Sequence, residues 1–252
     1  MKRAPGILFD DIVFRRGRQT IFDKLSLSLA GGGWHAVLGR SGVGKSSLLQ
    51  LIADLQQAAS GEVRADDGEA LAPRVAYMAQ DDGLLPWLSA LDNVQLGYRL
   101  RGQRDASSLA RAMHLMSRVG LAEWCDARPG VLSGGMRQRV ALARTLFEDR
   151  PIVLMDEPFS RLDALTRDEL QQLAFDLLDK RTVVLVTHDP LEALRLASTI
   201  TLLHESAPAR TSAFTLADSP PRQPDDVAVA ALARKLRDAL AVGSSHNPTA
   251  VA

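Results

Sequence analysis

The fold of this chain is decided by the stretch Gly39-Arg40-Ser41-Gly42-Val43-Gly44-Lys45-Ser46. It fits the pattern G-x-x-x-x-G-K-[ST], which is the phosphate loop. The apolar run at 34–38 before it indicates a buried strand, and residues 47–52 after it indicate a helix. A strand, a glycine-rich turn and a helix in this order are the context that the motif requires. We therefore predict a phosphate-binding site on an α/β fold.

The residue types of this stretch suit a chain of phosphates. Glycines let backbone N–H groups turn inward around phosphate oxygens, and the following helix presents its positive N-terminal end to the same anion. We expect the Lys45 ammonium to reach the β- and γ-phosphates and the Ser46 hydroxyl to hold Mg²⁺. A chance glycine-rich turn is the alternative, and it matches about one time in a hundred in a chain this long. The expected nucleotide contacts here are Gly39, Ser41, Gly42, Gly44, Lys45, Ser46 and Ser47.

Composition excludes several classes of protein. The chain has 252 residues, enough for one large domain or two small ones, and 46% are hydrophobic, which permits a full core. Basic and acidic side chains balance at 30 each, which argues against a nucleic-acid partner. The single cysteine, Cys125, fits a reducing compartment. No apolar run approaches the ~20 residues of a membrane span and no signal core follows the N-terminus, so we expect a soluble, cytosolic chain.

The first half of the chain predicts strands and then a helical insertion. Short, partly alternating apolar runs in 7–38 favour β-structure, and 60–63 and 75–78 add further strands. From residue 84 to about 130 the pattern changes to helical spacing, with Ser107 as a cap. The apolar positions of this helix, which we expect in the core, are Leu109, Ala112, Met113, Met116 and Val119.

Two later apolar runs end in side chains that can do chemistry. Residues 152–155 lead to Asp156 and Glu157, and residues 182–187 lead to His188. Parallel strands present their carboxyl ends at the crevice where α/β proteins bind ligands. Asp156 suits Mg²⁺, Glu157 suits a general base that polarises water, and His188 suits a γ-phosphate contact. A solvated acidic pair and a structural histidine are the alternatives, and the phosphate loop favours the functional interpretation.

A glycine pair opens the helix predicted at 132–147. Gly134 and Gly135 follow Ser133, and each glycine in a helix interior costs about 1 kcal/mol relative to alanine. The benefit would be a close approach of the backbone to a partner, since an open helix N-terminus suits an anion. An ordinary loop-to-helix cap is the alternative for this segment alone.

The C-terminal part predicts little chemistry. Residues 205–226 are rich in Pro, Ala and Ser, and we expect an irregular surface segment. A terminal helix follows, with Val229, Leu232, Leu236 and Leu240 at helical spacing, and we expect fraying from Gly243.

With these motifs in order, the chain resembles the ATP-binding subunit of an ABC transporter over about residues 7–204. Walker A lies at 39–46, the glutamine loop at Gln80 and the signature at 132–139. Walker B lies at 152–157, the D-loop contains Asp163, and the switch histidine is His188. The signature between the two Walker motifs is nearly unique to this family.

The resemblance implies a fold and a division of the chain. The fold is α/β, a P-loop NTPase core with a mostly parallel sheet, an N-terminal antiparallel β subdomain and an inserted α-helical subdomain. The ATPase domain would span 1–204, with the helical subdomain at about 84–147. Residues 205–252 would form the irregular segment and the terminal helix.

The resemblance also implies a mechanism with ATP and Mg²⁺ as cofactors. Two copies would close head to tail as a homodimer, with each ATP on the Walker A loop of one copy and under Ser133 and Gly135 of the other. Glu157 would activate the attacking water, and Gln80 would touch Mg²⁺ or the water. The implied catalytic set is Glu157, His188, Gln80 and Lys45, and the implied metal set is Ser46, Gln80 and Asp156.

Three positions depart from the family pattern. Where family members carry an aromatic residue that stacks on adenine, this chain has Arg16, with Phe14 two residues earlier, and arginine can also stack on a ring. Met136 replaces a frequent glutamine in the signature, and Arg161 replaces a frequent small residue in the D-loop. Neither Met136 nor Arg161 touches the expected chemistry.

The segment after Gln80 indicates the subtype. Residues 84–87 and 92–94 are similar to those of importers for nitrate, sulfonates and taurine, and of related importers for thiamine or its pyrimidine precursor. Such a subunit would bind a membrane permease at the cytoplasmic face of the inner or plasma membrane, and a separate solute-binding protein would complete the system. Leu84, Trp87 and Tyr98 form the candidate docking surface, unless they pack within the helical subdomain.

Two other classes of function remain at this point. One is a soluble ABC ATPase without a permease, such as a cluster-assembly ATPase. The other is a monomeric P-loop kinase, which would need neither the signature nor the switch histidine.

Overall fold

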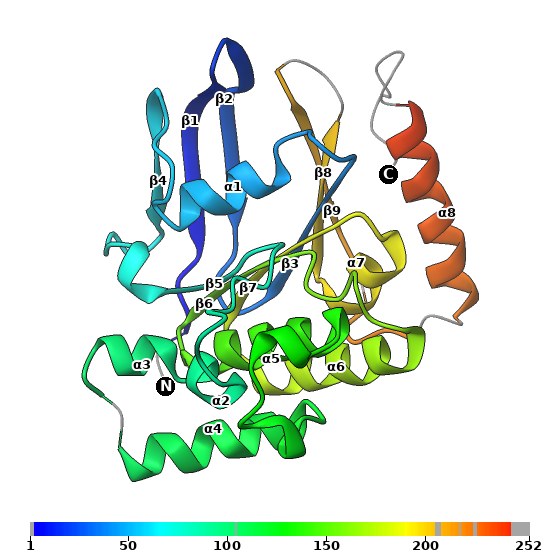
Figure 1. Ribbon diagram of the computed structural model, residues 1–252. Coiled ribbons are helices and arrows are strands. Elements are labelled where there is room, and N and C mark those ends of the chain that lie inside the picture. Colours follow the sequence, from blue (N-terminus) through cyan, green and yellow to red (C-terminus); the bar gives the residue numbers. More distant parts are fainter. Residues whose placement is uncertain (1–2, 104, 205–207, 217, 224–225, 243–252) are drawn as a thin grey trace.

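The computed structural model describes residues 3–103, 105–204, 208–216, 218–223 and 226–242 (Figure 1). Its larger sheet has six strands in the order β5-β6-β7-β3-β8-β9, in which the first five are parallel and β9 is antiparallel to β8. The strands are β3 (Trp34–Gly39), β5 (Val75–Met78), β6 (Ile152–Asp156), β7 (Thr182–Thr187), β8 (Thr199–His204) and β9 (Arg210–Thr215).

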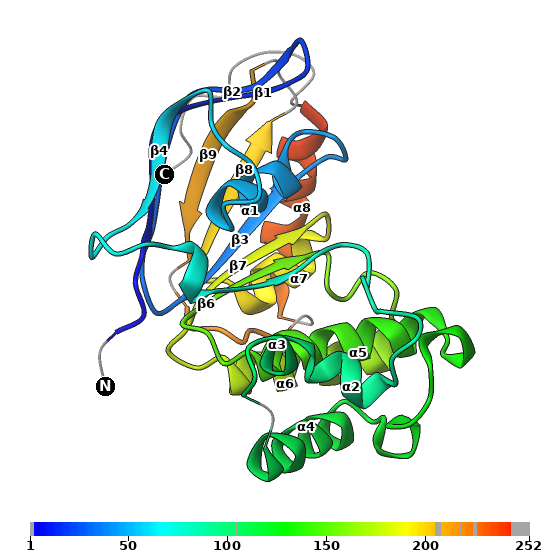
Figure 2. The same cartoon turned by 60° about the vertical axis from the view of Figure 1, so that its left-hand side comes forward.

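A second sheet contains three antiparallel strands in the order β2-β1-β4. They are β1 (Ile7–Arg16), β2 (Gln19–Leu29) and β4 (Ser60–Ala65). The phosphate-loop helix α1 (Lys45–Ile52) lies between this sheet and the larger one, and its Leu48 and Leu49 are fully buried there (Figures 1 and 2).

The remaining helices cover the other face of the larger sheet. Between β5 and β6 the chain forms α2 (Ala90–Val94), α3 (Leu96–Leu100), α4 (Ala106–Arg118), the short 3₁₀ turns Ala122–Trp124 and Pro129–Val131, and α5 (Gly134–Phe147). A third 3₁₀ turn, Ala72–Arg74, precedes β5. After β6 come α6 (Ala164–Leu177), α7 (Pro190–Leu196) and α8 (Val227–Val242), which packs beside α7 (Figure 1).

Alternation along the central strands explains how both faces are buried. Val153 and Met155 of β6 pack with the helical insertion and α6, whereas Leu154 points to α1 and the antiparallel sheet. Because side chains alternate across a strand, a continuous apolar run serves two cores at once. The predicted mostly parallel core, the antiparallel N-terminal strands and the inserted helices are confirmed.

Three expectations are corrected. Helix α4 is capped by Asp105, which exchanges hydrogen bonds with Ser108 in a capping box, so Ser107 is not the cap. Met113 is 51% exposed, because it lies on the outer side of α4 while Ala112 and Met116 face the core. Residues 205–226 are not irregular throughout, because β9 pairs with β8 from His204–Arg210 to Thr199–Thr215.

The terminal helix is present as predicted, with Val229, Ala233 and Leu236 buried against α7 and the sheet. The predicted fraying from Gly243 lies outside the described residues. Among the helices that the structure describes, none is both long and apolar enough to cross a membrane.

Candidate nucleotide site

The phosphate loop joins the central strand β3 to α1. Gly44 sits at the N-cap of α1 with φ 111°, and a Cβ there would lie 2.6 Å from Ile21, so only glycine fits. This turn brings Lys45 inward, where it is 6% exposed. Its Nζ donates hydrogen bonds to the carbonyl oxygens of Gly39 at 2.8 Å and Arg40 at 3.1 Å. A buried cation held at a glycine-rich turn suits phosphate.

Two carboxylates from the end of β6 face this lysine. Asp156 is buried, its carboxylate accepts a hydrogen bond from the Ser46 hydroxyl, and it interacts with the charge of Lys45. Burial raises the pKa of Asp156, and Glu157 raises it further, while Ser46 and Lys45 act in the opposite direction. Burial lowers the pKa of Lys45, opposed by Glu157 and Asp156. A hydroxyl beside a carboxylate is a set of hard oxygen donors, which fits Mg²⁺.

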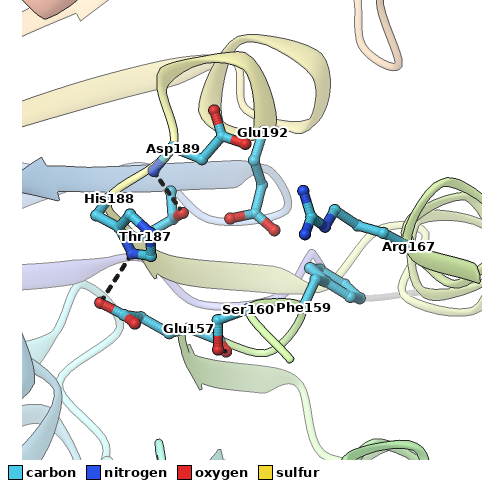
Figure 3. A pocket seen from close by; sticks show the side chains of 8 residues that line it. All are labelled: Glu157, Phe159, Ser160, Arg167, Thr187, His188, Asp189 and Glu192. Carbon is cyan, nitrogen blue, oxygen red and sulfur yellow. Dashed lines mark hydrogen bonds and ion pairs between the residues drawn. The ribbon is translucent and has the colours of Figure 1, made fainter. Parts of the chain in front are cut away.

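Glu157 connects three motifs. Its Oε2 accepts a hydrogen bond from Gln80 Nε2 at 3.3 Å, and its Oε1 lies 3.2 Å from His188 Nδ1. The Glu157 backbone has φ 50°, and its N–H donates to the Val186 carbonyl at 2.9 Å. The positive φ turns the chain at the end of β6, so that Glu157 points toward the histidine from β7 (Figure 3).

A small pocket opens beside this pair. Its volume is about 60 Å³, and Glu157 and His188 line one end of it. Figure 3 shows the remaining lining side chains, which come from the loop after β6, from α6, from the end of β7 and from the start of α7: Phe159, Ser160, Arg167, Thr187, Asp189 and Glu192.

The signature residues lie elsewhere. Ser133 caps α5 by accepting a hydrogen bond from the Met136 N–H at 3.2 Å, and its side chain is exposed. Helix α5 packs on one face of the sheet, whereas α1 packs on the opposite face. Among the hydrogen bonds of the described residues, none joins Ser133 or Gly135 to residues 39–47. The structure therefore brings together every predicted site residue except these two.

Sequence reasoning missed a buried amide that holds this arrangement. Gln138 of α5 donates from Nε2 to the Glu157 carbonyl at 3.0 Å and accepts at Oε1 from the Arg161 N–H at 3.0 Å. Arg137 and Arg144 of the same helix hold the glutamine loop by bonds to Asp82. The sequence motif contains Gln138 but does not indicate its role, because a sequence does not show which polar side chains turn inward.

Of the two residues that could stack on adenine, only one lies at the surface. Phe14 is 3% exposed and packs against Phe22, with ring centroids 6.3 Å apart, so it is a core residue. Arg16 is exposed, and its Nη2 donates to Ser47 Oγ at 3.3 Å, at the start of α1.

The candidate docking residues also differ in exposure, because two pack inside the helical insertion and one lies at the surface. Leu84 is 8% exposed within the helical core, and Tyr98 packs with its ring centroid 4.7 Å from that of Phe147. Trp87 is 66% exposed, and Leu100 is 78% exposed. Packing inside the helical subdomain therefore explains Leu84 and Tyr98 but not Trp87.

The fold and the site define a P-loop nucleotide-binding ATPase. Comparison with known proteins extends this: residues 22–160 match the family model described as ABC transporter. The chain belongs to the ABC transporter family, as an ATP-binding and ATP-hydrolysing subunit.

The relatives and solved structures agree with this assignment. The chain is 44% identical to the taurine import ATP-binding protein of Pseudomonas aeruginosa, over 78% of this chain and 76% of the relative. It is 43% identical to an aliphatic sulfonates import ATP-binding protein of Rhodococcus jostii, over 88% and 87%. A dimeric ATP-binding cassette in a post-hydrolysis state with ADP and Pi is 28% identical, with a TM-score of 0.73 over 82% of this chain and 97% of that one.

Proposed function

We propose that this chain energises an importer of a small solute by hydrolysing ATP as a head-to-tail homodimer on a membrane permease. The observation that carries the proposal is the pair of half-sites: Glu157 meets His188 and Gln80 beside the phosphate loop, while Ser133 stands exposed on another helix. A second copy supplies the missing half, as the dimeric state of the similar cassette supports.

In this mechanism each residue has one task. The loop amides and Lys45 bind the β- and γ-phosphates, and closing the dimer brings Ser133 and Gly135 of the other copy onto the γ-phosphate. Glu157 accepts a proton from the attacking water, and His188 holds the carboxylate and the γ-phosphate in line. Gln80 loses or gains its bond to Glu157 as the nucleotide changes, which reports the state of the site to the helical insertion.

Mg²⁺ would be held by Ser46 and Asp156, and Gln80 is the third candidate ligand. When bound, it neutralises charge that develops on the phosphates. Asp156 and the Ser46 hydroxyl already contact each other, so the two ligands need little rearrangement.

The permease contact is assigned to Trp87 and its surroundings. An indole that is two-thirds exposed on the segment next to the glutamine loop is a costly surface residue unless a partner covers it. Binding there places the subunit peripherally at the cytoplasmic face of the membrane. The named relatives favour taurine or an aliphatic sulfonate as the solute, with nitrate and thiamine precursors as further candidates.

A pull-down tests this proposal. The tagged chain is recovered from detergent-solubilised membranes of the native organism and its partners are identified by mass spectrometry. We expect a multi-span permease, and its solute-binding protein can then be tested with taurine and alkanesulfonates. Recovery of soluble partners alone would contradict the importer and favour a soluble ABC ATPase.

A pair of tryptophan variants makes the test specific. Trp87→Ala should lower permease recovery about tenfold or more, the usual cost of a buried aromatic contact. Trp124→Ala is the matched control, because Trp124 is 41% exposed on the same helical insertion. Equal recovery with both variants would contradict the placement of the permease at Trp87.

A further inference from the structure

A buried carboxyl lies directly behind the switch histidine. Glu192 stands in the first turn of α7, three residues after Asp189, whose side chain caps that helix, and it is 6% exposed. Burying a carboxyl costs free energy unless hydrogen bonds and charges satisfy it. Glu192 has no task in the proposed mechanism of hydrolysis.

Its first contact leads to His188. Thr187 and Glu192 line the same pocket, and the Thr187 hydroxyl acts on the Glu192 carboxyl as a donor that lowers its pKa. The same Thr187 oxygen accepts the Asp189 N–H at 3.0 Å. A hydroxyl has a single proton, so giving it to Glu192 turns a lone pair toward the Asp189 N–H. Glu192 thereby fixes the backbone on both sides of His188.

Its second contact leads to the D-loop. Gln171 of α6 donates from Nε2 to Glu192 Oε1 at 3.3 Å. One turn earlier on α6, the guanidinium of Arg167 points toward the Glu192 carboxylate across the pocket (Figure 3). Arg167 also donates from Nη2 to the Leu162 carbonyl at 2.9 Å, within the segment that precedes α6. Helix α6 is therefore bonded to Glu192 through Gln171 and to the D-loop segment through Arg167.

We propose that Glu192 is a positioning residue for ATP hydrolysis, which holds His188 in place through Thr187 and connects it to the D-loop end of α6. The proposal rests on the proposed contact of His188 with the γ-phosphate. It adds a residue that touches no reacting atom and acts through its neighbours.

The charge of Glu192 gives this role a pH dependence. Burial raises the pKa of Glu192 to about 7, and Asp189 raises it too, while Thr187, Gln171 and Arg167 oppose the shift. His188 and Glu157 face the same pocket from the ends of β7 and β6. An ionised carboxylate offers both oxygens as strong acceptors to Thr187 and Gln171, whereas protonation turns one oxygen into a donor and weakens the carboxyl as an acceptor. Positioning is therefore complete above pH 7 and weaker below it.

The test is steady-state ATPase kinetics from pH 6 to pH 9. At pH 8, Glu192→Gln should lower kcat about tenfold with KM for ATP changed less than about twofold, since only the transition-state arrangement is disturbed. The wild-type kcat should rise through pH 7 as Glu192 ionises, and this rise should be smaller in Glu192→Gln. Glu169→Gln, the same substitution at an exposed position of α6, is the control and should match the wild type.

A second variant tests the path through Thr187. Thr187→Val should lower kcat by a similar factor, and the double variant should be no slower than either single one, because both break the same contact. Thr201→Val, at a buried threonine of strand β8 in the same sheet, is the control. Additive losses in the double variant would overturn the proposal, and so would an unchanged kcat and pH profile in Glu192→Gln.

Failure of this proposal is separable from failure of the proposed function. His188→Ala tests the premise in the same assay. A slow His188→Ala beside a normal Glu192→Gln overturns the positioning role alone. A normal His188→Ala removes the task of His188 and with it that of Glu192.

Discussion

The carboxyl edge of the six-stranded sheet and the N-terminus of α5 differ in how much one chain can complete. At the sheet edge, Glu157 follows β6, His188 follows β7, and Lys45 follows the loop after β3; Glu157 pairs with His188, and its charge raises the pKa of Lys45. At α5, Ser133 makes a local cap and is exposed. Parallel topology gathers the first group because neighbouring strands end at the same edge. No such rule brings the second group to the nucleotide within one chain, which is why we propose that a second copy supplies it.

Lys45→Ala should have the largest effect, because it removes the buried charge of the phosphate-loop half-site at the sheet edge. We expect about a 1000-fold loss of ATPase activity, since one fixed charge near developing charge is worth about that much. Nucleotide affinity, measured by calorimetry, should fall as well. The control is Lys180→Ala at an exposed lysine. Normal turnover would contradict the Walker A assignment.

Ser133→Arg should disrupt the half-site at the N-terminus of α5 and leave the phosphate-loop half-site at the sheet edge intact. A long charged side chain at the α5 cap blocks closure onto the γ-phosphate of the other copy, so turnover should fall about 100-fold while ATP binding by the single chain is kept. Ser117→Arg, on the exposed side of α4, is the control. Undiminished turnover in Ser133→Arg would contradict a shared site.

A mixture of the Lys45→Ala and Ser133→Arg variants tests whether two chains exchange half-sites. In a mixed dimer, the phosphate loop of the Ser133→Arg chain meets the signature of the Lys45→Ala chain, so one of two sites is intact. With random pairing and independent sites, about a quarter of wild-type activity should return. Activity that stays at the level of the separate variants at any mixing ratio would contradict head-to-tail exchange of half-sites.

Glu192→Gln should change stability in a pH-dependent way. The ordinary pKa of glutamate is 4.5 and burial raises that of Glu192 to about 7. Below pH 4.5 both the folded and unfolded states hold the proton. As pH rises toward 7, only the unfolded state releases it, so the free energy of unfolding falls, by about 3 kcal/mol in total once pH exceeds 7.

The glutamine variant lacks this loss. Urea denaturation at pH 5 and pH 8 should show a smaller decrease for Glu192→Gln than for the wild type, while Glu169→Gln should follow the wild type. The same decrease in all three proteins would contradict the raised pKa of Glu192.

Gln138→Leu should have the smallest effect. It removes the amide that holds the backbone of Glu157 and Arg161, leaving the side chains of the site in place. We expect kcat to fall about tenfold and the free energy of unfolding by about 1–3 kcal/mol, the cost of unpaired buried groups. Denaturation and ATPase assays measure both, and an unchanged kcat would show that Gln138 only stabilises the fold.

Local patterns predicted most of the fold and the complete half of the site. The phosphate loop carries its own signal, and the strands before Glu157 and His188 are apolar throughout, so their polar ends were visible. Strand β9 was missed because only Phe214 stands out among small and polar residues, and pairing with β8 forms it.

Buried polar residues were missed for a different reason. Glu192 stands where an acid usually serves the positive end of a helix, so its sequence position does not indicate burial. Asp105 and Ser107 are both good caps, and the reciprocal bonds to Ser108 decide between them. These choices depend on tertiary contacts, which a single sequence does not display.

The most direct test of the shared site is the molar mass of Glu157→Gln with and without Mg·ATP, measured by light scattering. We expect this variant to bind ATP and hydrolyse it slowly, so the mass should rise from one chain to two when ATP is added. Adding Ser133→Arg to the same chain should abolish the rise while ATP binding persists. Wild-type hydrolysis by Glu157→Gln, or an equal rise with Ser133→Arg present, would contradict the account.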